Sequence, residues 1–280
     1  MGSGSIARLL VVSSASCVLL PAPAPAHVDS VCAALAPVFG ASGSAEWDER
    51  RVAARAAGLT AAAAGRGAMH ELVYGELGIS ALANLLGALR IRPGDAFVDI
   101  GAGDGVLVLA APLLYPELRT SRGIECLPEL VARAEAHLSA WAGSQETPPL
   151  IDFTLADVYD PDGPASAILA DSDVAVCFAT TWAGIEAGTE AGAEGCTDLP
   201  RLAAILAATM RPGSRVALVD ARLEPNVGTA GGGKTTGDVT SGFRLEAELR
   251  LECPDTVPYS TARIYTLVGS QTGSSVYQPA

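Results

Sequence analysis

From about residue 80 to residue 220, short apolar runs alternate with longer segments in which apolar residues recur every three or four positions. The short runs are typical of buried strands, and the longer segments are typical of helices with one apolar face. The predicted strands span residues 96–100, 121–125, 151–155, 174–179 and 215–220. The predicted helices span residues 80–90, 105–114, 128–141 and 199–210. This alternation favours a doubly wound sheet of mostly parallel strands.

The last two predicted strands, at residues 243–252 and 262–268, have no helical segment between them. Consecutive strands without a crossover helix form an antiparallel hairpin. We therefore expect an α/β fold whose mostly parallel sheet has seven strands, of which the last two form a C-terminal antiparallel hairpin.

The first residues differ from the rest of the chain in charge. Residues 1–28 contain no acidic side chain, an apolar stretch at residues 9–20 follows Arg8, and Ala24-Pro25-Ala26 comes next. This layout is typical of a secretory signal, and the absence of acids also suits an organelle transit peptide. We interpret residues 1–28 as a disordered leader or targeting segment outside the fold. Without a targeting role the protein would be cytoplasmic or nuclear.

Two further ranges complete the expected domain organisation. Residues 45–65 are charged at first and then rich in alanine, which favours a helix, so we expect residues 29–70 to form an N-terminal helical segment. Residues 71–280 contain all the predicted strands and form the main domain.

Composition argues against several classes of function. The net charge is −13 and Lys234 is the only lysine, so the surface repels phosphate backbones and strong nucleic-acid binding is not expected. No apolar run after residue 30 reaches the ~20 residues of a transmembrane helix. The six cysteines are scattered without a Cys-x-x-Cys pair, and the three histidines do not cluster. We therefore expect no disulfide framework and no metal site.

A glycine-rich loop carries the strongest chemical signal. The first predicted strand contains Asp99 and runs into Gly101-Ala102-Gly103-Asp104-Gly105. Glycines let such a loop turn tightly and approach a ligand closely. A dinucleotide-binding loop would need its third glycine at position 106, which is a valine here. The pattern Asp-x-Gly-x-Gly-x-Gly instead resembles motif I of the class I (seven-strand) S-adenosylmethionine-dependent methyltransferases.

This resemblance assigns a cofactor-binding role to residues at three successive strand ends. In that family the acid and the loop hold the amino-acid part of the cofactor, which implies that role for Asp99 and for Gly101, Ala102, Gly103 and Gly105. Glu125 ends the second strand about 20 residues after the loop, where a carboxylate accepts hydrogen bonds from ribose hydroxyls. Asp157 follows the third strand, where the family has an acid facing the adenine amino group.

Two more blocks narrow the resemblance. Val73-Tyr74-Gly75-Glu76 lies upstream of the loop, and Thr180-Thr181-Trp182-Ala183 follows the fourth strand. With the glycine loop, they resemble the disruptor-of-telomeric-silencing type of non-SET histone lysine methyltransferases. There the Tyr-Gly-Glu loop folds over the cofactor, which implies cofactor contacts for Tyr74 and Glu76. The second block occupies the place of the Asn-Asn-Phe-Ala motif of that family, and in this chain threonines stand where the family has the two asparagines. The resemblance implies a cofactor contact for Thr180.

The resemblance implies an S-adenosylmethionine-dependent methyltransferase that acts on a lysine-bearing protein such as a histone. The implied catalytic residues are Tyr74, Thr180, Thr181 and Trp182. Because fold does not fix the acceptor, a small-molecule methyltransferase is one alternative. The replaced asparagines suggest another, a non-catalytic module that only binds the cofactor.

A third alternative is a nucleotide hydrolase, because residues 228–235 match the phosphate-loop pattern Gly-x-x-x-x-Gly-Lys-Thr. That loop requires a helix directly after it, and the residues that follow here do not favour one. We therefore interpret residues 225–242 as a Gly/Thr-rich connection.

Overall fold

The architecture was established from a computed structural model of the chain. It describes residues 19–41, 43–63, 77–143, 150–179, 182, 198–223, 239–240, 242–253 and 257–268.

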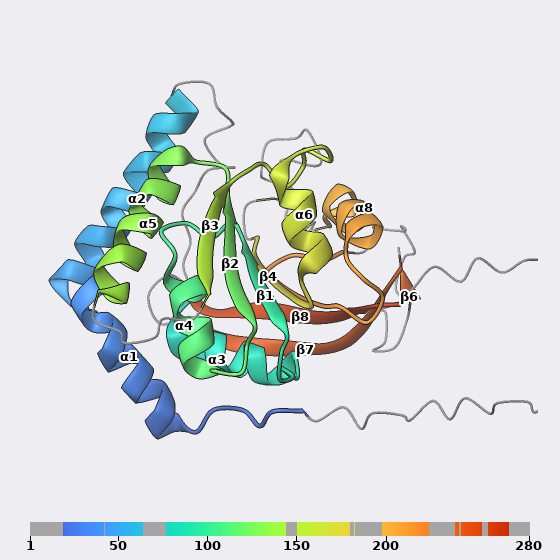
Figure 1. The fold of residues 1–280 in the computed structure, drawn as a ribbon, viewed down its shortest axis with the longest axis horizontal. Helices are drawn as coiled ribbons and strands as arrows, with labels where there is room; N and C mark the ends of the chain where they lie inside the picture. The colour runs from blue at the N-terminus through green and yellow to red at the C-terminus, as the bar shows by residue number, and fades with distance from the viewer. Residues whose placement is uncertain are drawn as a thin grey trace, which may run out of the picture.

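One mixed sheet forms the centre of the protein (Figure 1). Its strands are β1 (Ala96–Ile100), β2 (Thr120–Glu125), β3 (Ile151–Leu155), β4 (Val174–Phe178), β5 (Arg215–Val219), β6 (Val239–Thr240), β7 (Phe243–Cys253) and β8 (Val257–Leu267). They lie in the order β3-β2-β1-β4-β5-β8-β7-β6. Strands β1 to β5 run parallel, and β8 is antiparallel to both β5 and β7. The seven predicted strands and the C-terminal antiparallel hairpin are confirmed, and the short strand β6 adds an eighth strand at the edge of the sheet. The architecture is a Rossmann-like, doubly wound α/β fold.

Seven described helices surround the sheet. They are α1 (Pro25–Phe39), α2 (Ala45–Ala63), α3 (Ile79–Ala88), α4 (Val106–Leu114), α5 (Pro128–Ala142), α6 (Pro164–Asp171) and α8 (Pro200–Thr209). Alternate residues of the central strands point to opposite faces, so that Phe97 and Val98 belong to two different apolar clusters. The Phe97 cluster includes residues of α1, α3, α4 and α5, and the Val98 cluster includes residues of α6 and α8. The sheet therefore has helices on both faces, as the alternating pattern predicts.

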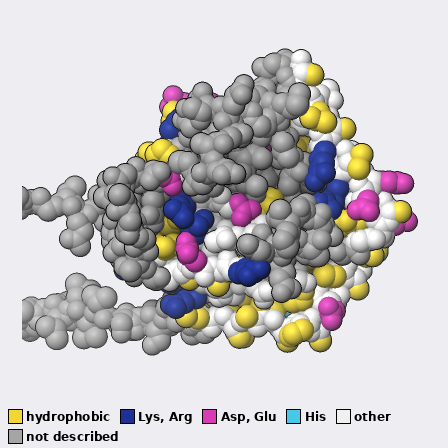
Figure 2. Space-filling view, turned by 180° about the vertical axis from the view of Figure 1, so that it is seen from behind, with side chains coloured by type: hydrophobic (Ala, Val, Ile, Leu, Met, Phe, Trp, Pro, Cys, Tyr) yellow, Lys and Arg dark blue, Asp and Glu magenta, His cyan; other side chains and the backbone are white. Residues whose placement is uncertain are grey.

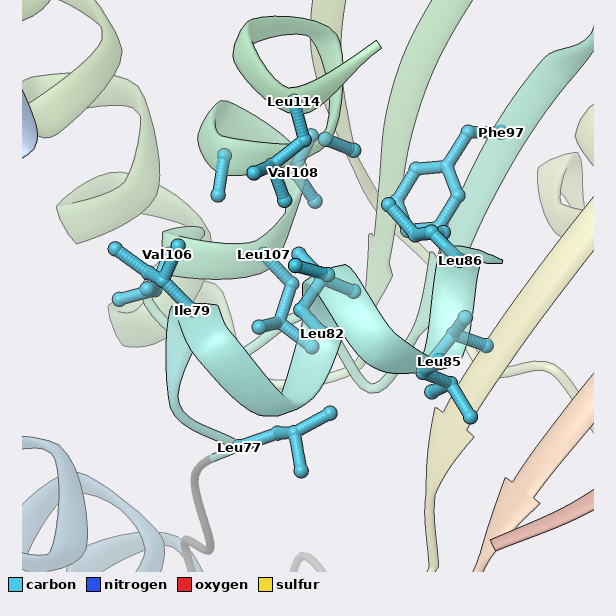
Figure 3. Close-up of a cluster of buried hydrophobic side chains, with 14 of the residues drawn as sticks. Leu77, Ile79, Leu82, Leu85, Leu86, Phe97, Val106, Leu107, Val108 and Leu114 are labelled. Atoms are coloured by element: carbon cyan, nitrogen blue, oxygen red, sulfur yellow. The ribbon is translucent and has the colours of Figure 1, made fainter. Parts of the chain in front are cut away.

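Helix α4 is apolar on all sides, and its surroundings explain why. Nearly every residue from Val106 to Leu114 is buried. The close-up in Figure 3 shows Leu107 of α4 beside Leu82 of α3, and Leu86 of α3 beside Phe97 of β1. A helix covered by the sheet on one side and by other helices on the other has no face left for polar residues. This packing fixes the start of α4, and the glycine loop directly precedes it.

The predicted leader boundary at residue 28 is wrong, because the described fold begins well before it. Helix α1 starts at Pro25, and Val28 is buried in the core. The Leu20 amide donates a hydrogen bond of 2.9 Å to the Ile91 carbonyl oxygen. Proline suits the first turn of a helix, and the buried Val28, Val31 and Leu35 lie on one face of α1. Residues 1–18 are not described, and a targeting role for them stays a prediction.

The structure differs from the expectations at two more places. Helix α6 was missed, because its eight residues are small for the most part and give a weak helical repeat. The predicted connection at residues 225–242 contains the two-residue strand β6, which pairs with the start of β7. None of the described helices combines the length and the apolar character that a membrane crossing requires.

Candidate functional site

Parallel pairing brings the predicted strand-end residues to one edge of the sheet. Asp99 of β1 lies in register with Gly123 of β2, and Glu125 of β2 lies in register with Leu155 of β3. Asp157 follows two residues after Leu155, at the same edge. In open α/β sheets, ligands bind outside the carboxyl ends of the strands. The three carboxylates therefore lie where this fold type binds small molecules.

The glycine loop between β1 and α4 is tightly tied to β2. The amides of Gly101 and Ala102 both donate to the Ile124 carbonyl oxygen, at 2.8 and 3.0 Å. Gly105 caps α4 with a φ of 95°, in the left-handed region that favours glycine. A Cβ at Gly105 would lie 2.6 Å from Cζ of Phe153, so that only glycine fits there.

This contact predicts that Gly105→Ala costs more stability than the same replacement at a glycine with open space around it. Gly94 is the matched control, because its φ is 84° and a Cβ there would meet nothing within 4 Å. Both variants place an alanine in the left-handed region that favours glycine, which costs stability in each. Only Gly105→Ala also displaces the Phe153 ring, which adds about 1–3 kcal/mol to the loss of folding stability. Urea unfolding of the two variants measures the difference. Equal losses would mean that Phe153 moves aside without cost.

Asp99 is a buried carboxylate with one oxygen that lacks a hydrogen-bond donor among the described residues. Its side chain is 2% exposed, and its buried Oδ1 atom receives no hydrogen bond from the part of the chain that the structure describes. Burial, and then the nearby Glu125 charge, raise the pKa of Asp99 well above its ordinary value. A buried carboxylate without a partner is costly, and a cation bound beside it would remove that cost.

Glu125 joins the glycine loop to the start of α5. Its Oε2 atom accepts a hydrogen bond of 2.9 Å from the Gly103 amide, and its Oε1 atom accepts one of 2.9 Å from the Leu127 amide. Burial raises the pKa of Glu125, and these backbone donors offset part of the rise. The Cys126 amide and thiol also lie near this carboxylate, and a thiol is a weak donor that a ligand hydroxyl can replace. Its role in holding the loop was not foreseen from the sequence.

Asp157 lies at the exposed end of β3. Its Oδ1 atom accepts a hydrogen bond of 2.9 Å from the Tyr159 amide, which forms an Asx turn. The preceding residue, Ala156, donates its amide to the Glu125 carbonyl oxygen at 2.9 Å. Burial of the thiol, and then the Glu125 carboxylate, raise the pKa of Cys126 to about 12, and the Asp157 charge adds to the rise. The backbone pairing therefore places Asp157 at the same edge of the sheet as Glu125.

An aromatic pair flanks the glycine loop. Cζ2 of Trp182 lies 3.1 Å from the position that a Cβ would take at Gly101. The rings of Trp182 and Tyr159 lie 6.1 Å apart, and the Arg201 guanidinium lies 4.7 Å from the centre of the Tyr159 ring. A place for Tyr159 at this site was not predicted, although its position two residues after Asp157 could have indicated that it lies at the same edge of the sheet.

Several predicted residues lie outside the described residues: Tyr74, Glu76, Thr180, Thr181 and the phosphate-loop match at 228–235. Within the described ranges, no group of three or more His, Cys, Asp or Glu side chains could hold a metal ion.

Comparisons with known proteins find a family model and solved structures that resemble parts of this chain. The family model described as "Histone methylation protein DOT1" matches residues 51–143, about a third of the chain, including the glycine loop and Glu125. A search of the curated proteins finds no match.

Three solved structures illustrate the similarity. An RNA methyltransferase from Salinibacter ruber, in complex with S-adenosyl-L-homocysteine, is 17% identical, with 69% of this chain and 94% of that chain covered and a TM-score of 0.45. TrmN from Thermus thermophilus is 18% identical, with 69% and 50% covered and a TM-score of 0.47. A precorrin-6y C5,15-methyltransferase from Geobacter metallireducens is 14% identical, with 66% and 86% covered and a TM-score of 0.40.

Proposed function

We propose that this protein is an S-adenosylmethionine-dependent methyltransferase. The observation that carries the proposal is the buried Asp99 carboxylate, whose Oδ1 atom has no partner among the described residues and lies beside the glycine loop at the carboxyl edge of β1. An ammonium group placed there would supply the missing charge and hydrogen bonds. The amino-acid end of S-adenosylmethionine carries such a group, so the residues present fit this cofactor.

The other residues at this edge fit the rest of the same molecule. The Glu125 carboxylate can accept hydrogen bonds from ribose hydroxyls, and the exposed Asp157 can accept one from an adenine amino group. When bound, S-adenosylmethionine supplies an electrophilic methyl group. The protein then has to orient the acceptor and exclude water, for which the Trp182 and Tyr159 rings provide apolar surface.

We propose protein lysine as the methyl acceptor. The match to the histone-methylation family over residues 51–143 supports this choice. The chain has 31 acidic and 18 basic residues, which favours association with a basic protein. In Figure 2, described basic and acidic side chains lie beside one another on the face that is seen from behind. A lysine must lose its proton before it attacks, and apolar walls such as Trp182, with Tyr74 as a second candidate, favour the neutral amine.

Calorimetry and a methyl-transfer assay together test the proposal. We expect the protein to bind S-adenosylmethionine and S-adenosylhomocysteine, with binding lost in Asp99→Ala and kept in Glu117→Ala, an exposed acid near the opposite edge. With a tritiated methyl group, we expect label on lysines of basic proteins such as histones. Label on small molecules only would overturn the lysine assignment, and tight binding without transfer would indicate a non-catalytic module. ATP binding that is lost in Lys234→Ala, without cofactor binding, would contradict the whole proposal.

A further inference from the structure

The N-terminal helices reach the glycine loop through one buried ion pair. Asp104, in the middle of that loop, is fully buried. Nη1 of Arg50, on α2, lies 2.9 Å from Oδ1 and 2.8 Å from Oδ2 of this carboxylate. The Arg50 side chain is itself only 5% exposed. Either charge would be costly to bury without the other, because it would be left uncompensated in a low-dielectric surrounding. The position of Asp104 therefore depends on α2, which carries Arg50.

Arg50 is held in place by aromatic residues at the ends of two helices. Its guanidinium lies 4.4 Å from the Trp47 ring and 5.4 Å from the Phe39 ring. Its Nε atom donates a hydrogen bond of 3.3 Å to the Phe39 carbonyl oxygen. A planar guanidinium that is stacked and hydrogen-bonded in this way has one orientation, which is the orientation that Asp104 meets.

Helix α5 completes the support from the other side. Nδ1 of His137 lies 3.0 Å from the Asp104 carbonyl oxygen, and the His137 ring contacts the Phe39 ring edge-on, with centres 4.7 Å apart. Nη2 of Arg133 lies 3.8 Å from Oδ2 of Asp104. Figure 1 shows α2 and α5 side by side along this edge of the molecule. Both the side chain and the backbone of Asp104 are therefore fixed by helices outside the sheet.

The neighbours of Asp104 link this support to the candidate cofactor site. Gly103 precedes it and donates its amide to Glu125, and Gly105 follows it and caps α4. A shift of Asp104 would therefore move the amide that Glu125 holds. We propose that Arg50 is a positioning residue for cofactor binding and that α2 acts through the Arg50–Asp104 pair to hold the glycine loop in its binding conformation. This inference rests on the proposed function, because it names the loop as part of the cofactor site.

A second buried ion pair provides a matched control. Nη2 of Arg215 lies 2.7 Å from Oδ2 of Asp95, with both side chains nearly as buried as those of Arg50 and Asp104. This pair lies at the starts of β1 and β5, at the opposite edge of the sheet. Arg215→Met therefore breaks a comparably buried pair without touching the glycine loop. A purely structural role for Arg50 predicts the same effects for both variants.

The experiment compares Arg50→Met, Arg50→Lys and Arg215→Met with the parent protein. S-adenosylhomocysteine affinity is measured by calorimetry, and amide hydrogen exchange is followed over residues 101–105. We expect Arg50→Met to weaken binding about tenfold and to speed exchange in the loop, because a displaced loop binds poorly. Arg50→Lys keeps the charge and should recover part of the affinity. Arg215→Met should lower the melting temperature while it leaves affinity and loop exchange unchanged.

The outcomes separate this inference from the proposed function. Loop exchange that is unchanged in Arg50→Met, or that rises equally in Arg215→Met, overturns the positioning role. If the parent protein binds no S-adenosylhomocysteine, the proposed function fails, and the exchange measurement still decides whether Arg50 holds the loop. If Arg50→Met does not fold, Arg50→Lys is compared with Arg215→Lys by the same two measurements, and equal effects contradict the inference.

Discussion

Asp99→Asn should abolish most cofactor binding and at the same time stabilise the ligand-free protein. The loss of binding follows from the charge, because a hydrogen bond to a charged group contributes about 1.5–3 kcal/mol. We therefore expect S-adenosylhomocysteine affinity to fall roughly a hundredfold, since 1.4 kcal/mol corresponds to a factor of ten. The gain in stability follows from burial, because the carboxylate is unpartnered at Oδ1 and the amide that replaces it carries no charge.

The direction of the pKa shift fixes how this gain depends on pH. Burial and the Glu125 charge raise the pKa of Asp99 in the folded protein well above 3.8. Between 3.8 and the raised value, the folded state holds a proton that the unfolded state has lost, so the stability of the parent protein falls as pH rises through this window. Below the window Asp99 is neutral in both states. The advantage of Asp99→Asn should therefore be absent at about pH 3 and should grow as the pH rises through this window.

Thermal unfolding of the ligand-free proteins across this pH range measures the effect. Each kcal/mol that is relieved should raise the melting temperature by about 2–4 °C. Asp95→Asn is the matched control, because Asp95 is also buried but is paired with Arg215. Its replacement leaves a buried charge without its partner and should destabilise the protein by about 3–5 kcal/mol. A lower melting temperature for Asp99→Asn at neutral pH would show that the native structure already satisfies this carboxylate.

The parts of the site that sequence could predict are those that local patterns determine. An apolar run followed by glycines identifies β1 and its loop, and the spacing to Glu125 follows from one strand-helix-strand unit. Parallel pairing then places Asp99 and Glu125 at the same edge, whatever the details of packing. For this reason the fold and the acidic strand ends were predictable from a single chain.

The parts that were missed depend on contacts between distant residues. Arg50 and Asp104 are 54 positions apart, and nothing near either residue indicates the other. Asp104 alone resembles an exposed loop acid, and only the packing of α2 against α5 makes it a buried ion-pair partner. The boundary error near residue 28 has a similar origin, because α1 gains its stability from burial of residues such as Leu35 in the common core.

Replacement of Glu125 should weaken cofactor binding by the protein for two separable reasons. Glu125→Ala removes the acceptor of the Gly103 and Leu127 amides, and each buried amide left without a partner costs about 1–3 kcal/mol. It also removes the carboxylate that we assign to the ribose hydroxyls. We therefore expect S-adenosylhomocysteine affinity to fall by more than about tenfold, with a parallel loss in the free energy of unfolding.

Glu125→Gln and a ligand without the 2′-hydroxyl separate the two roles. Glutamine keeps the shape of the side chain and one acceptor oxygen, so the loop loses at most one of its two hydrogen bonds. The parent protein should bind S-adenosylhomocysteine about tenfold more tightly than its 2′-deoxy analogue. Glu125→Gln should discriminate little between them, because the two changes remove the same interaction and their effects do not add. If the variant keeps the full discrimination, Glu125 acts on the cofactor only through Gly103, and the ribose contact belongs to another residue.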